Sequence, residues 1–303
     1  MQRFYLLALA VAICLSSHTR SWGQIAADAQ PVVDAQRSFV ALAESEGIKS
    51  AFTKSLARDS TIFRPGPVNG LEYWKASKDP SSLLLSRNIT YADVASNGLM
   101  GYTTGNWRQY ERGKSESFAK FGQYVTVWEK QPDGKWLATI DIGISHDKLP
   151  FSETDKILHK RETRDPNKRG WSPADASMNF TRASMAPEAL GGAFEQFAAD
   201  DVRFLRDDAP PILGRKDVIK ATRKYRSIRF PERIALFQSA DMAYTWNPCK
   251  FADSEEGIEE GNCLQIWKLR DKRWLIVLSI YAKVPTVTPP VLKAKTKEKA
   301  TKP

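Results

Sequence analysis

Histidine is scarce in this chain, and its scarcity excludes several kinds of active site. Of the three histidines in 303 residues, His18 lies near the N-terminus and only His146 and His159 lie beyond residue 23. Two histidines cannot form a multi-histidine metal site, so we predict no metal. The sequence also lacks His-Glu-x-x-His, Gly-x-Ser-x-Gly, phosphate-loop and dinucleotide-binding motifs. We therefore expect no cofactor, while the question of catalysis stays open.

Hydrophobic runs long enough to cross a bilayer are also missing. The apolar run at 4–15 follows Arg3 and precedes the small-x-small sequence Ser21-Trp22-Gly23. A charged start, a short apolar stretch and a small-residue site are typical of a signal peptide. We predict a signal peptide at 1–23, an extracytoplasmic protein (periplasmic or secreted) and a mature chain without a transmembrane segment. Ile13 before Cys14 argues against lipoprotein processing.

The net charge of +10 is unevenly distributed along the chain. Residues 286–303 carry five lysines against one glutamate, together with Pro289-Pro290. Such a segment has too few apolar residues to form a core, so we predict a flexible basic tail. Adhesion to anionic polymers is one interpretation and a solubilising role is the other; neither predicts a specific nucleic-acid partner.

An internal repeat organises the remaining sequence. An apolar stripe within 32–43, a second within 48–56 and a hairpin around Gln131-Pro132-Asp133-Gly134 predict helices followed by strands. The same order recurs about 140 residues later, as in Ala51-Phe52 and Ala193-Phe194. We predict two copies of one unit, at 28–146 and 175–285. The mixed-charge stretch 147–174 is the predicted linker.

The repeat also suggests how the two remaining cysteines are used. Cys249 and Cys263 flank an acidic loop near Glu256, so on a symmetric hairpin they face each other. A disulfide is one interpretation and a pair of buried thiols is the other. The equivalent residues of the first copy, Trp107 and Tyr124, would form an aromatic cross-strand pair.

Segments 57–66 and 199–204, each leading from a helix into a strand, and the hairpin segment 122–136 resemble the nuclear transport factor 2 (NTF2) superfamily. The similarity is to its SnoaL-like and ketosteroid-isomerase-like members, and within them to the domain of unknown function 4440 subgroup. It implies an α+β fold with two cone-shaped units. In each unit, N-terminal helices would pack on a strongly curved, mainly antiparallel sheet around a pocket.

Isomerase chemistry does not carry over to the matching positions. The catalytic base falls on Arg64 and Arg206, which stay protonated. The helix tyrosine falls on Val40, and the oxyanion aspartate falls on Thr126. Steroid-isomerase catalysis is therefore not expected. An arginine at this position offers donors suited to a carboxylate or phosphate, or else reaches solvent or pairs with an acid.

Asp141 is the other candidate catalytic residue. Alternation along the last strand groups it with Leu137, Thr139 and Gly143 on the face that the resemblance turns toward the cavity. Asp141 would serve as an acid or base, or form an ion pair with Arg64. Aromatic side chains would either line the pocket or belong to the core: Tyr102, Trp107, Tyr124 and Trp128.

Three functions fit these residues. The first is binding of a small anionic or polar aromatic molecule in the first copy. The second is a cofactor-independent isomerase, dehydratase or hydrolase that uses Asp141 with Arg64. The third is a non-catalytic scaffold whose open sheet faces form a homodimer or contact envelope proteins.

Overall fold

The computed structural model describes seven segments of the chain. They are 29–114, 119–148, 171–185, 190–223, 225–230, 235–253 and 257–285. The predicted signal peptide, the basic tail and most of the predicted linker lie outside these segments. No helix within them is long and apolar enough to cross a membrane.

The first copy begins with helices and continues as a sheet. The predicted apolar stripes correspond to α1 (Gln30–Ser45) and α2 (Ile48–Ser55), which Gly47 separates at a positive φ of 95°. The remaining elements are β1 (Leu56–Phe63), β2 (Pro67–Asn69), α3 (Gly70–Ala76), β3 (Leu83–Val94), β4 (Met100–Glu111), β5 (Lys120–Lys130) and β6 (Trp136–His146). The strand order is β2-β1-β6-β5-β4-β3, and all pairs are antiparallel except β1 with β6.

The second copy repeats this order. Its elements are α4 (Pro173–Ser184), α5 (Leu190–Phe197), β7 (Ala198–Arg206), β8 (Ile212–Leu213), α6 (Arg215–Thr222), β9 (Tyr225–Arg229), β10 (Ala235–Ser239), β11 (Met242–Asp253), β12 (Ile258–Arg270) and β13 (Arg273–Lys283). The one parallel pair is β7 with β13, which corresponds to β1 with β6. Two short strands, β9 and β10, pair with β11 in the place that the long β3 takes beside β4.

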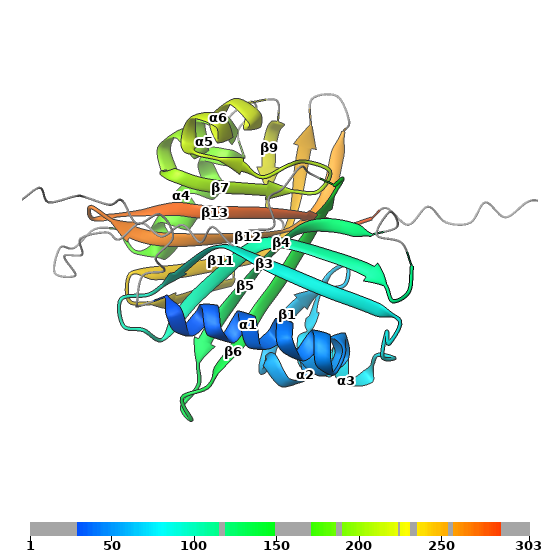
Figure 1. Ribbon diagram of the computed structural model, residues 1–303. Coiled ribbons are helices and arrows are strands. Elements are labelled where there is room, and N and C mark those ends of the chain that lie inside the picture. Colours follow the sequence, from blue (N-terminus) through cyan, green and yellow to red (C-terminus); the bar gives the residue numbers. More distant parts are fainter. Residues whose placement is uncertain are drawn as a thin grey trace, which may run out of the picture.

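The two sheets pack face to face, with helices on their outer sides (Figure 1). One apolar cluster contains side chains of both sheets, including Val125, Ile140 and Ile142 from the first and Leu264 and Ile280 from the second. Two further clusters join each sheet to its own helices. The α+β class and the two helix-and-sheet units predicted from the sequence are therefore confirmed.

Polar contacts also join the copies. The Lys268 ammonium, with a side chain only 5% exposed, lies 3.4 Å from Asp93 and 3.5 Å from Asp241 and donates to the Val94 carbonyl at 3.1 Å. Asp207 accepts from the backbone N–H of Ser145 in β6 at 2.7 Å and of Lys283 in β13 at 2.6 Å. A buried ammonium with carboxylate and carbonyl partners fixes how the sheets are aligned.

A β-bulge corrects one expectation about β6. Val127 pairs with Ile140 but Trp128 pairs with Ala138, so Thr139 is an extra residue. Ala138 therefore packs with the helices, whereas Ile140 packs between the sheets. Strict alternation, by which the sequence analysis groups Asp141 with Leu137, would place both on one face, because it does not allow for a bulge. The second copy has the same irregularity between Ile266 and Trp267.

Candidate functional site

The carboxylate of Asp141 is held by an ion pair beneath the first copy's helices. Arg87 donates from Nη1 to Oδ2 at 2.7 Å and from Nη2 to Oδ1 at 3.0 Å. Thr126 Oγ1 donates to Oδ2 at 2.7 Å. The side chains of Arg87 and Asp141 are 7% and 5% exposed. A bidentate pair with a third donor satisfies a buried carboxylate, which leaves Asp141 poorly placed to accept a substrate proton.

Three aromatic rings surround the Arg87 guanidinium. Its Cζ lies 4.8 Å from the ring centroid of Phe39, 5.5 Å from that of Phe52 and 4.6 Å from that of Tyr124. These rings come from α1, α2 and β5. The interior of the first cone is thus organised around a caged cation paired with one acid.

Sequence reasoning missed Arg87, although a signal was present. Leu83, Leu85 and Ile89 pack with the helices, and Arg87 lies at the same alternation in β3. A single charge in the apolar alternation of a strand indicates a buried partner. The sequence does not show which of several acids pairs with Arg87, because Asp141 lies 54 positions away.

Arg64 does not take the position expected of it. It is exposed, and its Nη1 donates to the carbonyl of Phe63 at 2.8 Å. Strand β1 ends at Phe63, and the backbone N–H of Arg64 donates to Gly66 in a turn that contains Pro65. The chain therefore leaves the sheet before this side chain can point into the cone. The predicted Arg64–Asp141 pair does not form, because Arg87 is the partner of Asp141.

Tyr102 and Trp107 lie on opposite faces of β4. They are five positions apart, and an odd separation reverses the face of a strand. Tyr102 packs in the cluster between the sheets, so it does not line the first cone. Trp107 donates from Nε1 to the carbonyls of Ile144 at 2.9 Å and Gln123 at 3.1 Å. Its donor is therefore engaged by the backbone.

Trp128 belongs to the core of the first copy. It is 1% exposed and donates from Nε1 to Thr103 Oγ1 at 3.0 Å. In the second copy, Trp267 makes the same bond to Thr245 Oγ1 at 3.1 Å. The repeat thus extends to single hydrogen bonds.

Arg206 points into the second cone, whereas its counterpart Arg64 does not point into the first. It donates to Glu259 at 3.0 Å and to the Tyr225 hydroxyl. The rings of Tyr225, Phe251 and Tyr281 lie within 5.8 Å of its Cζ. Burial, together with the negative charge of Glu259, raises the pKa of the Tyr281 phenol. Because Glu259 pairs with Arg206, the cation is not vacant for an anionic ligand.

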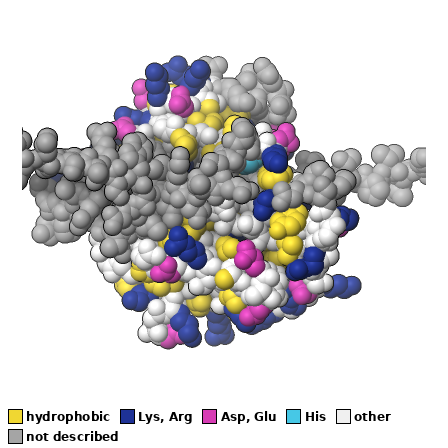
Figure 2. Space-filling model, viewed as in Figure 1, with side chains coloured by type: hydrophobic (Ala, Val, Ile, Leu, Met, Phe, Trp, Pro, Cys, Tyr) yellow, Lys and Arg dark blue, Asp and Glu magenta, His cyan; other side chains and the backbone are white. Residues whose placement is uncertain are grey.

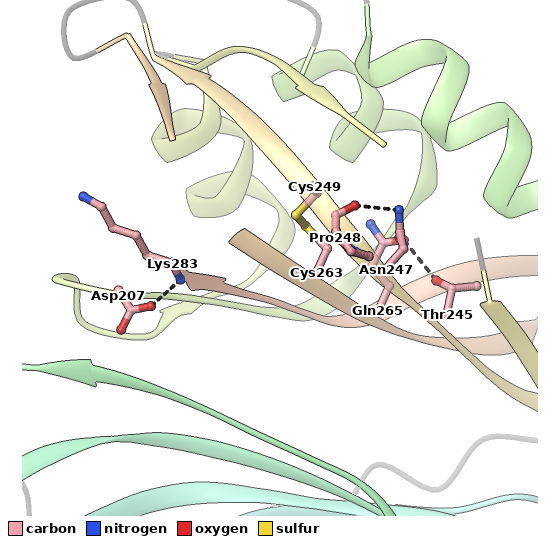
Figure 3. The surroundings of a disulfide bond; sticks show 8 residues. All are labelled: Asp207, Thr245, Asn247, Pro248, Cys249, Cys263, Gln265 and Lys283. Atoms are coloured by element: carbon pink, nitrogen blue, oxygen red, sulfur yellow. Dashed lines mark hydrogen bonds between the residues drawn. A yellow bond between two sulfur atoms is a disulfide. The ribbon is translucent and has the colours of Figure 1, made fainter. Parts of the chain in front are cut away.

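The predicted pair of Cys249 and Cys263 forms a disulfide with an S–S distance of 2.33 Å (Figure 3). The two cysteines are diagonal neighbours, because Cys249 pairs with Gly261 and Cys263 with Asn247. The expectation that they face each other directly was wrong by two residues of register. Trp107 and Tyr124 are likewise diagonal, since Trp107 pairs with Gly122 and Tyr124 with Gly105.

Several buried donors of the first copy have no acceptor within the described residues. Three of them are nitrogen donors: Gln36 Nε2 in α1, Trp74 Nε1 in α3 and Arg87 Nε in β3. Gln36 is 0% and Trp74 is 8% exposed. Phe52 contacts two of these residues, because the ring of Trp74 stacks on it at a centroid distance of 4.5 Å and the Cζ of Arg87 lies 5.5 Å from its centroid. The helix-facing interior therefore holds buried donors that the described residues do not pair.

No metal site is seen in the described part of the chain. No three His, Cys, Asp or Glu side chains there cluster as metal ligands. On the face drawn in Figure 2, cationic and anionic side chains are interspersed.

The sequence matches no protein-family model and no curated protein. Solved structures do resemble the chain. Several of them are described as NTF2-like proteins. One, of unknown function from Shewanella oneidensis MR-1, is 20% identical with a TM-score of 0.31, and the match covers 38% of this chain and 96% of that chain. These names do not test the domain of unknown function 4440 subgroup.

Two further structures show how varied the neighbours are. A putative ketosteroid isomerase from Parabacteroides distasonis is 13% identical, with a TM-score of 0.30 and coverage of 38% of this chain and 87% of that chain. A putative calcium/calmodulin dependent protein kinase II association domain from Xanthomonas campestris is 13% identical, with a TM-score of 0.31 and coverage of 43% and 99%. Similarity at this level does not transfer a function, and no step below depends on it.

Proposed function

We propose that this is an exported binding protein whose first copy takes up a small polar aromatic molecule rich in hydrogen-bond acceptors. The observation that carries the proposal is the set of buried donors without acceptors at Gln36, Trp74 and Arg87. Each such donor costs about 1–3 kcal/mol when it is removed from water and left unpaired. Native proteins pair almost all buried polar groups, which favours an acceptor from outside the described residues.

Contacts in the first cone connect these donors. Arg87 lies over Phe39, which follows Gln36 by three positions on α1 and so lies on the same helix face. Phe39 packs edge-on against Phe52 at 4.8 Å, and Phe52 stacks on Trp74. Rings and donors therefore lie together in the helix-facing interior of the first copy. A molecule with an aromatic ring and carbonyl or hydroxyl oxygens matches them in chemical character.

The Arg87–Asp141 pair favours a polar ligand over an anionic one. The sequence analysis left both classes open. Because Asp141 neutralises the guanidinium, the pair offers no net positive charge to an anion. Its remaining donor is Arg87 Nε, which suits a neutral oxygen acceptor. We therefore assign Arg87 and Asp141 to ligand positioning and not to acid–base chemistry.

Two features support the remaining parts of the proposal. Disulfides persist in oxidising compartments outside the cytoplasm, so the cysteine pair is consistent with export. The inner face of the first sheet is already covered by the second copy, so the second copy acts as a structural partner within the chain. This use of the sheet faces makes the homodimer scaffold a weaker account than ligand binding.

The test combines mass spectrometry of co-purifying small molecules with thermal shifts by benzamide, 4-hydroxybenzaldehyde and toluene. We expect the two oxygen-bearing probes to raise the melting temperature and toluene to have little effect. Gln36→Met removes the Nε2 donor at similar volume and should weaken binding about fivefold to tenfold, the value of one hydrogen bond.

Ser177→Ala is the matched control. Ser177 is 2% exposed in α4, and its hydroxyl also has no partner within the described residues, but it lies in the second copy. This variant should bind as the wild type does. The proposal fails if no oxygen-bearing probe shifts the wild type and nothing co-purifies, or if ordered waters alone satisfy the three donors in a crystal structure of protein soaked with the probes.

A further inference from the structure

A cavity of about 340 Å³ lies in the second copy, away from the buried arginine of either cone. It is formed where α5 ends, at the turn between β12 and β13, and beside the residue that leads into α4. Its lining residues are Trp171, Gln196, Phe197, Lys272, Arg273 and Trp274. The volume lies in the range of pockets that hold small organic molecules.

Aromatic side chains form the floor and one wall of this cavity. Phe197 and Trp274 are 4% and 5% exposed and belong to the core of the second copy, so they form a fixed floor. Trp171 is 57% exposed and forms the wall. A large aromatic side chain exposed beside an aromatic floor is suited to stacking on a planar ligand.

Two cations stand at the rim of the cavity. Arg273 is exposed and donates from Nη2 to the carbonyl of Gln196 at 2.7 Å, which fixes its guanidinium beside the opening. Lys272 is exposed and has no acidic partner within the described residues. A fixed guanidinium and an adjacent ammonium together favour a carboxylate.

The backbone places Lys272 in a conformation that lysine seldom adopts. The turn has positive φ at both central residues, 45° at Asp271 and 67° at Lys272. Turns of this kind favour glycine or asparagine. The corresponding turn of the first copy has Gly134, with φ of 86°, at its positive-φ position. The second copy thus carries a charged side chain at the cavity rim where glycine would be less strained.

We propose that this cavity binds a small aromatic carboxylate. The ring lies between Trp171 and the floor of Phe197 and Trp274, and the carboxylate faces Lys272 and Arg273. The site is separate from the one proposed in the first copy and takes an anion, whereas the Arg87–Asp141 pair disfavours one. Either site can therefore fail without the other.

Titration calorimetry of the full-length mature protein with naphthalene-2-carboxylate tests the proposal. We expect one molecule per chain, with affinity that falls as salt is raised because the cations are exposed. Naphthalene-2-methanol, which has the same rings but no charge, should bind at least about threefold more weakly. The proposal is overturned if the carboxylate does not bind or if the alcohol binds equally well.

Two substitutions locate the site. Trp171→Ala removes an exposed ring and should weaken binding at least about fivefold without lowering the melting temperature. Lys272→Gly should weaken binding about threefold while leaving the melting temperature unchanged or higher, because glycine relieves the positive φ. Loss of affinity with undiminished stability is not the result of a damaged fold.

Asp271→Gly is the matched control, since it relieves the same turn but keeps the lysine, and its affinity should not fall. Gln36→Met, in the first copy, should also leave this binding unchanged. The proposal is overturned if Trp171→Ala and Lys272→Gly both bind the carboxylate as the wild type does, or if Gln36→Met is the variant that loses binding.

Discussion

Each copy surrounds one arginine with three aromatic rings beside a carboxylate, but the two arginines come from different strands. In the first copy, Arg87 of β3 pairs with Asp141 of β6. In the second, Arg206 of β7 pairs with Glu259 of β12. Neither arginine occupies the place of the other in the repeat, although the cages are alike in composition.

Backbone differences explain the exchange. Strand β1 ends at Phe63, so Arg64 turns to solvent, whereas β7 continues through Arg206, which pairs with Tyr281. On the other side, the single strand β3 is replaced by β9 and β10, and β9 ends at Arg229. The comparison teaches that a cone of this kind accepts a buried cation from either side of the sheet, provided that a carboxylate faces it.

The largest effect is expected from removing the buried cation of the first copy. Arg87→Met leaves Asp141 with Thr126 as its one remaining side-chain partner. Leaving a buried charge unpaired costs about 3–5 kcal/mol. Urea unfolding should show this loss, and the double variant Arg87→Met/Asp141→Leu should recover most of it.

Arg206→Met sharpens the comparison. Glu259 would still have Lys283 at 3.0 Å, and the Arg206 side chain is 13% exposed, so we expect a smaller loss of about 1–2 kcal/mol. Equal losses for Arg87→Met and Arg206→Met would show that the two cages are energetically alike, contrary to our expectation.

The disulfide should stabilise the second copy alone. Changing Cys249 and Cys263 together to serine removes a link across a sequence separation of 14 residues. Restricting a loop of this size in the unfolded chain is worth about 3 kcal/mol. Denaturant unfolding should show that loss, and hydrogen exchange should place it in β11 and β12 and leave β4 and β5 protected. Two free thiols in non-reducing mass spectrometry of exported protein would contradict the premise.

The smallest effect is expected at Glu129, where the copies meet. Burial raises the pKa of its carboxyl above the ordinary value of 4.5, although hydrogen bonds from Tyr244 and Thr139 oppose the shift. The folded chain therefore holds this proton more tightly than the unfolded chain. Stability is greatest below pH 4.5, declines as pH rises through the raised pKa, and is level above it.

Glu129→Gln keeps an oxygen acceptor for Tyr244 and removes this decline. At neutral pH the variant should be more stable by roughly half a kcal/mol, and its pH profile should be flatter between about 4.5 and 7 than that of the wild type. Thermal unfolding across this range makes the measurement. A variant with the same slope as the wild type would assign the decline to another group, such as Asp207, whose pKa burial also raises.

The sequence alone determined the local and repeated features of this protein. Apolar periodicity determined α1 and α2, and Pro132-Asp133-Gly134 determined the hairpin of β5 and β6, because both signals depend on neighbours in the chain. The spacing of Cys249 and Cys263 pointed to their disulfide, since one hairpin brings them together.

Only the tertiary structure decided what lies in each cone. A bulge at Thr139 changed which side chains of β6 face the helices, and the end of β1 turned Arg64 outward. Each change depends on one or two residues, and no sequence pattern indicated either of them. The partner of Asp141 came from β3, 54 positions away, because sheet pairing and not sequence distance brings side chains together. A buried carboxylate pairs with the donor that lies nearest to it in the folded chain. Which donor that is depends on how both the sheet and the helices pack.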